Sequence, residues 1–259
     1  MERNDIKEAN RKAMTKFLLF TFAGAFVGGV IGFLSAKYGV DRLADGMKAA
    51  GAFFGKYVSS WILLAIAVIM PIAVIPVYRN VKSLLAEWDG EDEEVCDIAE
   101  RKINIMLLIT SIAMICNFFL IAATYSGGFA MYESGEKARM LALGVVAFLI
   151  ILVECIIIQQ KAVDITKIMY PEKTASVYDV KFQKKWVESC DEAEKIMIGK
   201  CAFEAYKVTN TTCVVLAVLL AIVAFTFDIG FLPSFVVCLI WLVNQCAYCR
   251  GAAKGSKVN

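Results

Sequence analysis

Residues 58–78 read VSSWILLAIAVIMPIAVIPVY, a stretch without Asp, Glu, Lys or Arg. A transmembrane helix needs about 20 mostly apolar residues to cross a hydrocarbon core of about 30 Å. Most charged residues of the chain lie between blocks of this kind. We therefore predict an all-α polytopic membrane bundle of six transmembrane helices. Its spans are residues 58–78 together with 17–38, 103–125, 140–158, 213–227 and 229–245.

The overall composition agrees with a membrane-embedded chain. Hydrophobic residues make up 59% of the 259 positions and charged residues 20%, with a mean hydropathy of +0.64. A soluble domain of this length would carry more polar surface. The net charge of +2 gives no indication of a nucleic-acid partner. The lipid bilayer is the partner that this composition predicts.

The positions of Lys and Arg predict the orientation, because these residues concentrate in cytoplasmic loops. With six spans, most of the 27 Lys and Arg residues fall on one side of the membrane. That side holds both terminal tails and the two long connectors, residues 79–102 and 159–210. We expect both termini to be cytoplasmic.

The last two apolar blocks are predicted to form two separate helices. Residues 213–243 contain one charge, Asp228, and would form a single helix of about 46 Å. Asp228, Gly230 and Pro233 together predict a tight turn, with the proline in the first turn of the next helix. We therefore expect three helical hairpins.

The gaps between the blocks predict further helices. Apolar spacing over Asp41–Lys56 predicts an amphipathic helix in the outer interface, with an irregular loop as the alternative. Spacing of the same kind in the second connector is compatible with one helix from about Tyr178 to Phe227, preceded by a capping box at Ser176-x-x-Asp179. These cytoplasmic segments are expected to be amphipathic.

A short sequence echo joins the two connectors. Cys96-Asp97-Ile98-Ala99-Glu100 recurs as Cys190-Asp191-Glu192-Ala193-Glu194. Trp88 precedes the first copy and Trp186 the second, at different distances. Duplication of a hairpin unit and chance similarity between two acidic helices both remain open at this point.

The second connector carries a family resemblance. Tyr178-Asp179-x-x-Phe182-x-x-Lys185-Trp186-x-x-Ser189-Cys190-Asp191-Glu192-Ala193-Glu194 resembles the most recognisable stretch of an uncharacterised family of six-span integral membrane proteins of Gram-positive (firmicute) bacteria, a domain of unknown function. Trp88-Asp89-Gly90-Glu91-Asp92-Glu93 is similar to the family's first cytoplasmic loop. The resemblance implies a bacterial plasma-membrane location and supplies no catalytic residues.

The sequence lacks the residues that several kinds of chemistry require. The chain has no histidine, which excludes His-dependent nucleophilic catalysis, His-ligated haem and phospho-His relays. It also has no Gly-rich phosphate loop ending in Gly-Lys-Ser/Thr. We expect a non-enzymatic protein with no catalytic residue, cofactor or metal site. Cys246-x-x-Cys249 could supply two zinc ligands, but thiols at a membrane interface are the favoured interpretation.

Polar and helix-distorting residues within the spans are few. Glu154 is the only acid well inside a predicted span, and it acts either in a proton or cation relay or as a side chain reaching the inner interface. Asn117 and Asn244 are expected to form interhelical hydrogen bonds. A helix-packing stripe is expected at Gly24, Gly28 and Gly32. Kinks are expected at Pro71 and Pro76.

The acidic run in the first connector also has two interpretations. Residues 87–94 hold six acids, which could bind a divalent cation or a basic partner. The run lacks the alternating spacing of a calcium loop, so a solvated turn is favoured.

The leading functional hypothesis is a sensor, accessory or scaffold subunit that contacts a protein partner through its cytoplasmic helices, either as a monomer or as a homo-oligomer. The alternative is a small transporter or permease component that uses Glu154 and the Pro-containing second span. The candidate residues are Glu154 in the fourth span and, in the connectors, Trp88, Asp89, Asp97, Glu100, Asp179, Trp186, Asp191, Glu192 and Glu194.

Overall fold

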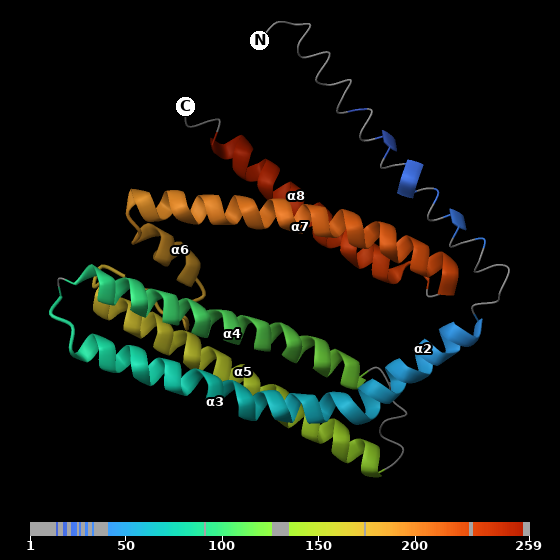
Figure 1. The fold of residues 1–259 in the computed structure, drawn as a ribbon, viewed down its shortest axis with the longest axis horizontal. Helices are drawn as coiled ribbons and strands as arrows, with labels where there is room; N and C mark the ends of the chain where they lie inside the picture. Colours follow the sequence, from blue (N-terminus) through green and yellow to red (C-terminus); the bar gives the residue numbers. More distant parts are fainter. Residues whose placement is uncertain are drawn as a thin grey trace, which may run out of the picture. The chain divides into compact units, whose positions relative to one another are not determined.

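The computed structural model describes residues 41–90, 92–125, 135–173, 175–227 and 230–255, with isolated positions before residue 41. The described residues form helices, turns and loops and contain no strand. The all-α class predicted from the sequence is therefore confirmed. The elements, shown in Figure 1, are α2 (Asp41–Phe53), the π-helix η1 (Phe54–Val58), α3 (Ser59–Ala86), α4 (Glu93–Tyr125), α5 (Gly135–Met169), α6 (Phe182–Glu188), α7 (Glu192–Phe227) and α8 (Leu232–Gly255).

Five described helical segments are long and apolar enough to cross a membrane. The first three contain a whole predicted apolar block and the last two contain most of one, so the chain is a helical membrane protein. The segments are Lys48–Ala86, Glu93–Tyr125, Ala138–Met169, Glu192–Ala224 and Leu232–Gly251. The first predicted span, residues 17–38, and the proposed packing residues Gly28 and Gly32 lie largely outside the described residues, and Gly24 is one of the isolated positions. The six-span count and the span limits stay predictions.

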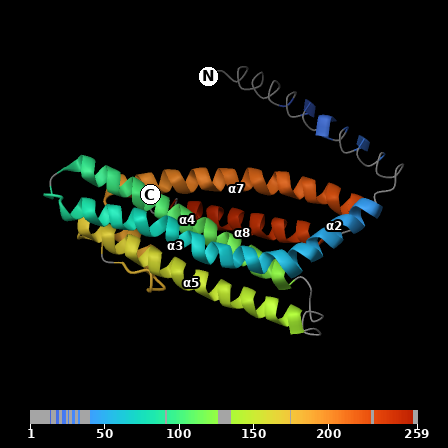
Figure 2. The same cartoon turned by 60° about the horizontal axis from the view of Figure 1, so that its bottom comes forward.

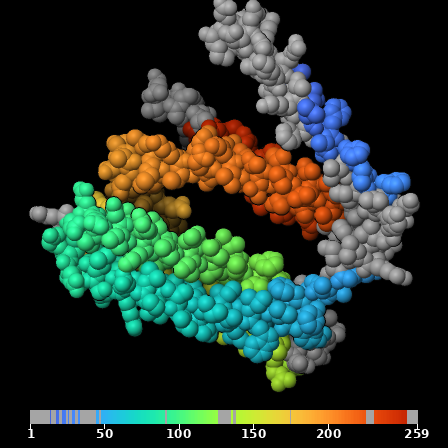
Figure 3. Space-filling model, in the orientation of Figure 1, coloured from blue at the N-terminus to red at the C-terminus, as the bar shows by residue number. Residues whose placement is uncertain are grey.

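The chain divides into two compact units, one of which covers Met47–Ile196. Its centre is a bundle of α3, α4 and α5 (Figure 1), in which each helix packs against the other two. Figure 3 shows the side chains of α3 and α4 in contact. Leu63, Met106 and Ile151 are completely buried where the three helices meet. Ile69, Ile112 and Val153 are exposed on the outside. An apolar core surrounded by apolar outer faces is the arrangement expected of helices in lipid.

Small polar contacts connect the helices of this bundle. Ser59 Oγ and Thr124 Oγ1 lie 2.7 Å apart between α3 and α4, and Ser60 Oγ donates to the Met140 carbonyl of α5 at 2.9 Å. Asn117 Nδ2 donates to the Phe148 carbonyl at 3.1 Å, which confirms its expected interhelical role. Such bonds satisfy buried donors where no water is present, whereas Asn117 Oδ1 is buried without a hydrogen-bond partner among the described residues.

A second cluster closes one end of the bundle. We call this end the connector end. Residues of α3, α4 and α5 contribute to it: Val81, Leu85, Ala99, Ile103, Ala162, Ile165 and Met169. Trp88 and Tyr170 pack against the cluster from the loops that leave α3 and α5. Both connectors therefore begin on the same apolar platform.

The other unit contains residues 197–259 together with residues 1–46. Within it α7 and α8 lie side by side (Figure 2). The Tyr206 and Tyr248 rings stack at 4.2 Å, and Tyr206 Oη hydrogen-bonds to Gln245 Oε1 at 2.7 Å. Because Tyr206 is early in α7 and Tyr248 late in α8, the helices are antiparallel. Asn244 donates to Asn210 at 3.3 Å, as expected for an interhelical partner.

The turn between these helices follows the predicted chemistry. Gly230 has a φ of +73°, in the left-handed region that glycine adopts without strain. Pro233 lies in the first turn of α8, where its missing N–H leaves no helical bond unmade. Blocks five and six are therefore separate helices.

Two sequence predictions need revision. The predicted helix over residues 178–227 is interrupted, because α6 ends at Glu188 and α7 begins at Glu192. The segment Asp41–Lys56 is helical, but it continues through the π-helix η1 into α3. The α3 helix includes both Pro71 and Pro76, and the kinks expected at these residues stay predictions.

Candidate functional site

Lys173, in the loop after α5, is the most unusual ionisable residue of the described chain. Its side chain is almost completely buried, at 1% relative exposure. The ammonium Nζ donates to Glu194 Oε2 at 2.5 Å, Cys190 Sγ at 3.2 Å and the Ser189 carbonyl at 3.4 Å. All three protons of the buried cation therefore have an acceptor. A buried charge is tolerated when it is paired and hydrogen-bonded in this way.

The aromatic ring of Trp186 completes the surroundings of the ammonium. The Lys173 Nζ lies 5.6 Å from the centre of this ring, within the range of a cation–π contact. Phe182 packs against the same indole at 5.6 Å. We refer to Lys173, Trp186, Ser189, Cys190 and Glu194 as the Lys173 site.

The motif Cys190-Asp191-x-Ala193-Glu194 is a capping box. The Glu194 N–H donates to Asp191 Oδ1 at 2.7 Å, and the Asp191 N–H donates to Glu194 Oε2 at 3.0 Å. This reciprocal pair satisfies two backbone donors where α7 begins. It also explains why the long predicted helix is interrupted here. Glu194 serves both the cap and the Lys173 ammonium.

The capping box predicted at Ser176 is wrong. Ser176 Oγ and the Val177 N–H both donate to Gln160 Oε1 of α5, at 3.0 and 2.9 Å. Asp179 accepts from the Lys181 N–H at 2.8 Å and from Lys185 Nζ. These residues form turns that attach the connector to α5, and α6 begins only at Phe182.

The first copy of the echo has a different structure. Cys96 and Asp97 lie inside α4, which begins at Glu93 and is capped by a bond from the Glu94 N–H to Asp92 Oδ1. Glu100 accepts a hydrogen bond from Tyr170 Oη at 2.6 Å. The two copies thus differ in local structure, although Glu100 and Glu194 both bind the segment Tyr170–Lys173.

Electrostatics reinforce these contacts. Burial alone would lower the pKa of Lys173, but its hydrogen bonds to Glu194 and Cys190 raise it overall. The hydrogen bond to Glu100, together with burial, raises the pKa of Tyr170. The bonds from Lys185 and from the Lys181 backbone lower the pKa of Asp179. The Lys173 ammonium is therefore the stable charged form near neutral pH.

The other connector candidates have local roles. Trp88 Nε1 donates to the Asp92 carbonyl at 3.1 Å, and the Asp92 N–H donates to Asp89 Oδ1 at 3.2 Å. Gly90, with φ +91°, turns the chain between them. The acidic run is thus a turn that caps α4, as favoured from the sequence. Glu192 is exposed and pairs with Lys195, and Asp97 is exposed on α4.

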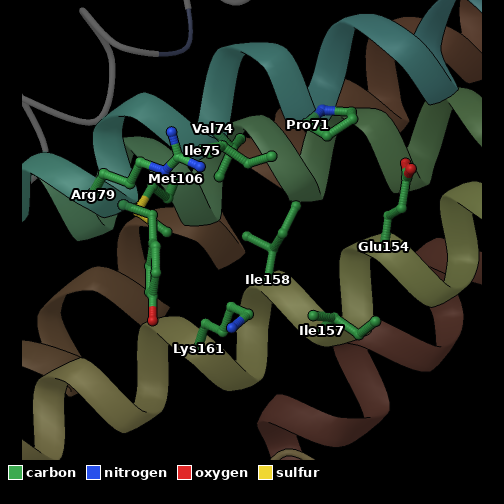
Figure 4. A pocket seen from close by; sticks show the side chains of 10 residues that line it. Pro71, Val74, Ile75, Arg79, Met106, Glu154, Ile157, Ile158 and Lys161 are labelled. Carbon is green, nitrogen blue, oxygen red and sulfur yellow. The ribbon is translucent and has the colours of Figure 1, made fainter. Parts of the chain in front are cut away.

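A groove of about 350 Å³ lies between α3 and α5 (Figure 4). Pro71 and Glu154 lie towards one end, and Arg79 and Lys161 lie towards the other. Met106 of α4 also lines the groove, and it is fully buried. The structure therefore brings together the two residues on which the transporter hypothesis depends. Pro76 does not line this groove.

Glu154 has one carboxylate oxygen, Oε2, that is buried without a hydrogen-bond partner among the described residues. Its neighbours in the groove are mostly aliphatic. No other acid among the described residues lines the groove. The described residues hold no group of three or more Cys, Asp or Glu side chains placed to bind a metal ion. All nine cysteines are free thiols, and Cys246 and Cys249 are exposed.

A family model described as a protein of unknown function, DUF3169, matches residues 8–251. The chain belongs to this family. The family resemblance inferred from the two connector motifs is therefore confirmed for nearly the whole chain. Searches of curated proteins and of solved structures find no match.

Sequence reasoning placed Asp191, Glu194 and Trp186 among the candidates but missed Lys173. Lys173 is one of many positive charges in its connector, and its spacing marks no helix face. The groove was missed because its lining residues come from three helices that are far apart in the sequence. The adjacent Tyr170-Pro171 could have marked the end of α5, since helices usually end before a proline.

Proposed function

We propose that this chain is a non-enzymatic accessory or scaffold subunit of a bacterial plasma membrane, with both termini in the cytoplasm. In this proposal the second connector presents a binding surface for a protein partner. The supporting observation is the Lys173 site, which fixes the connector to the bundle through one buried, fully hydrogen-bonded ammonium. Burying the Lys173 ammonium costs desolvation energy, and the contacts that offset this cost hold the connector in place. An ordered connector is better suited to recognition than a flexible linker.

The outward side of the connector offers apolar side chains to a partner. Tyr178 and Val180 are strongly exposed, and Val187 of α6 is also exposed. Charged residues of the same segment surround them in the sequence, and Lys184 pairs with Glu188 and Lys185 with Asp179. Exposed apolar residues surrounded by charge are typical of a protein-binding patch.

The test is capture of partners with the full-length protein from its own membranes. Tyr178→Ser combined with Val180→Ser should lose a partner that the wild type retains, because both changes remove apolar contact area. The matched control is Val153→Ser with Ile69→Ser, which alters exposed side chains of the spans instead. An unchanged set of captured proteins in the connector variant would contradict the proposal.

The groove supports a second candidate, a transporter or permease component. The observation in its favour is that Pro71 and Glu154 line the same groove. Proline frees a backbone carbonyl one turn earlier, which can serve as a ligand or allow bending. Flux into proteoliposomes that disappears in Glu154→Gln would support this candidate, and wild-type flux in that variant would contradict it.

A further inference from the structure

The groove between α3 and α5 has an apolar channel that opens on the outside of the bundle. Val74 of α3 and Met106 of α4 form its buried floor. Ile75 and Ile157 stand on opposite sides and are 44% and 42% exposed. The outside of a membrane bundle is in contact with acyl chains, so the channel is accessible from the lipid phase.

One end of the groove is positively charged. Arg79 of α3 is exposed, and Lys161 of α5 lies 5.1 Å above the Tyr78 ring. Neither cation forms an ion pair with any described residue. Two unpaired cations beside an apolar channel favour an anionic group attached to a hydrocarbon chain.

The dimensions match this amphiphilic pattern. Arg79 follows Pro71 by eight residues, or about 12 Å along α3, and Lys161 follows Glu154 by seven, or about 10 Å along α5. The two cations therefore lie towards the same end of the groove, one on each helix, as Figure 4 shows, and the carboxylate lies towards the other end. With the orientation predicted from Lys and Arg, the cationic end is at the inner surface of the membrane.

We propose that this groove binds one anionic phospholipid of the inner leaflet. The phosphate of its headgroup contacts Arg79 and Lys161, and part of one acyl chain fills the channel over Val74 and Met106. Basic pockets between transmembrane helices on the cytoplasmic side are suited to anionic headgroups. This site does not depend on the proposed function of the connector.

The experiment is native mass spectrometry of the purified full-length protein titrated with phosphatidylglycerol, with phosphatidylcholine of the same chains as the neutral-headgroup comparison. We expect one phosphatidylglycerol to bind the wild type more tightly than phosphatidylcholine. Arg79→Gln with Lys161→Gln should weaken that binding about 10- to 30-fold, since each cation near the surface contributes to attraction of anionic lipid.

Matched variants separate charge from folding. Lys82→Gln with Arg101→Gln removes two exposed cations near the same end of the bundle but outside the groove, and it should bind lipid as the wild type does. Arg79→Lys with Lys161→Arg keeps both charges and should retain binding. Ile157→Trp fills the channel and should lose it, whereas Glu154→Gln should bind at least as tightly as the wild type.

Four results would overturn the proposal. These are equal binding of the two lipids, full binding by Arg79→Gln/Lys161→Gln, lost binding by the charge-preserving variant, and competition by millimolar inorganic phosphate equal to that by lipid. The last result would assign the cations to a free anion. Loss of proteoliposome flux in Glu154→Gln, with lipid binding retained, would support transport separately from the lipid site.

Discussion

At the scale of single residues, Lys173 shows how one buried charge organises a connector. Its ammonium joins the loop after α5 to Ser189 and Cys190 and to Glu194 in the first turn of α7. Removing one member of such a buried pair is more damaging than removing an exposed ion pair, because the remaining charge keeps its desolvation cost. The consequences differ for the two partners, since the Glu194 side chain retains 31% exposure and the Lys173 side chain only 1%.

Glu194→Gln should therefore loosen the connector. The change leaves the Lys173 charge with neutral acceptors only, and we expect a loss of about 1–3 kcal/mol of local stability. Hydrogen exchange over residues 176–196 should become faster in the variant. Glu192→Gln removes an exposed acid two residues away and should leave exchange unchanged. Equal exchange rates for Glu194→Gln and the wild type would contradict a structural role for the pair.

The pH dependence follows from the raised pKa of Lys173. Because its pKa in the folded protein is above the ordinary value of 10.5, its contribution to stability is complete below pH 10.5 and is lost as pH rises through the folded pKa. Opening of the connector, measured by cysteine labelling at Cys190, should increase above this pH in the wild type. In Lys173→Met, the pH dependence of Cys190 labelling that comes from the Lys173 ammonium should be absent.

At the scale of elements, the two echo motifs have different roles despite their similar sequences. Asp191 begins α7 by accepting the Glu194 N–H, whereas Asp97 is an exposed residue inside α4. Sequence similarity over five residues did not predict this difference, because a capping box depends on where the preceding helix ends. The Lys173 loop and the end of α6 determine that position.

Asp191→Ala should destabilise the start of α7 by about 1 kcal/mol, the usual cost of losing an N-cap side chain. Asp97→Ala is the matched control and should have an effect close to zero, because alanine favours a helix interior. Hydrogen exchange of the first turn of α7 and thermal unfolding in detergent measure the difference. Equal destabilisation by both changes would indicate that the copies are structurally equivalent after all.

At the scale of the whole molecule, close packing of the three-helix bundle depends on small residues. A Cβ added at Gly144 of α5 would lie 2.8 Å from Ser60 Oγ and 3.4 Å from Thr124 Cγ2. Ser60 is itself held by its bond to the Met140 carbonyl. Gly144 is therefore a contact point of all three helices, although the helix-packing glycines predicted from the sequence all lie in the first span.

Gly144→Ala should destabilise the bundle by about 1–3 kcal/mol through overpacking. Gly199→Ala, in α7, meets no atom within 4 Å and should be neutral or slightly stabilising, because alanine is the better helix former. Unfolding of the full-length protein in mixed detergent and denaturant gives the comparison. A neutral result for Gly144→Ala would show that Ser60 moves aside without cost.

The sequence predicted the features that depend on composition and local chemistry. Apolar length identified the helical membrane class, and Gly230 with Pro233 predicted the separation of α7 from α8. It did not predict the Lys173 site or the groove, because both bring together residues from different helices. The break at Asp191 was missed for another reason. Apolar spacing continues across it and favoured one helix, although the local pair Asp191-x-x-Glu194 forms a capping box there.

The burial of Lys173 also affects its covalent chemistry. A lysine reacts with acyl donors through its neutral amine, which requires loss of a proton and an open line of approach. The three acceptors around Nζ hold its protons, and the surrounding side chains block access. The neighbouring Lys181, Lys184 and Lys185 are exposed. Within one short connector, amine-reactive reagents should therefore modify the exposed lysines while Lys173 remains unmodified until the connector opens.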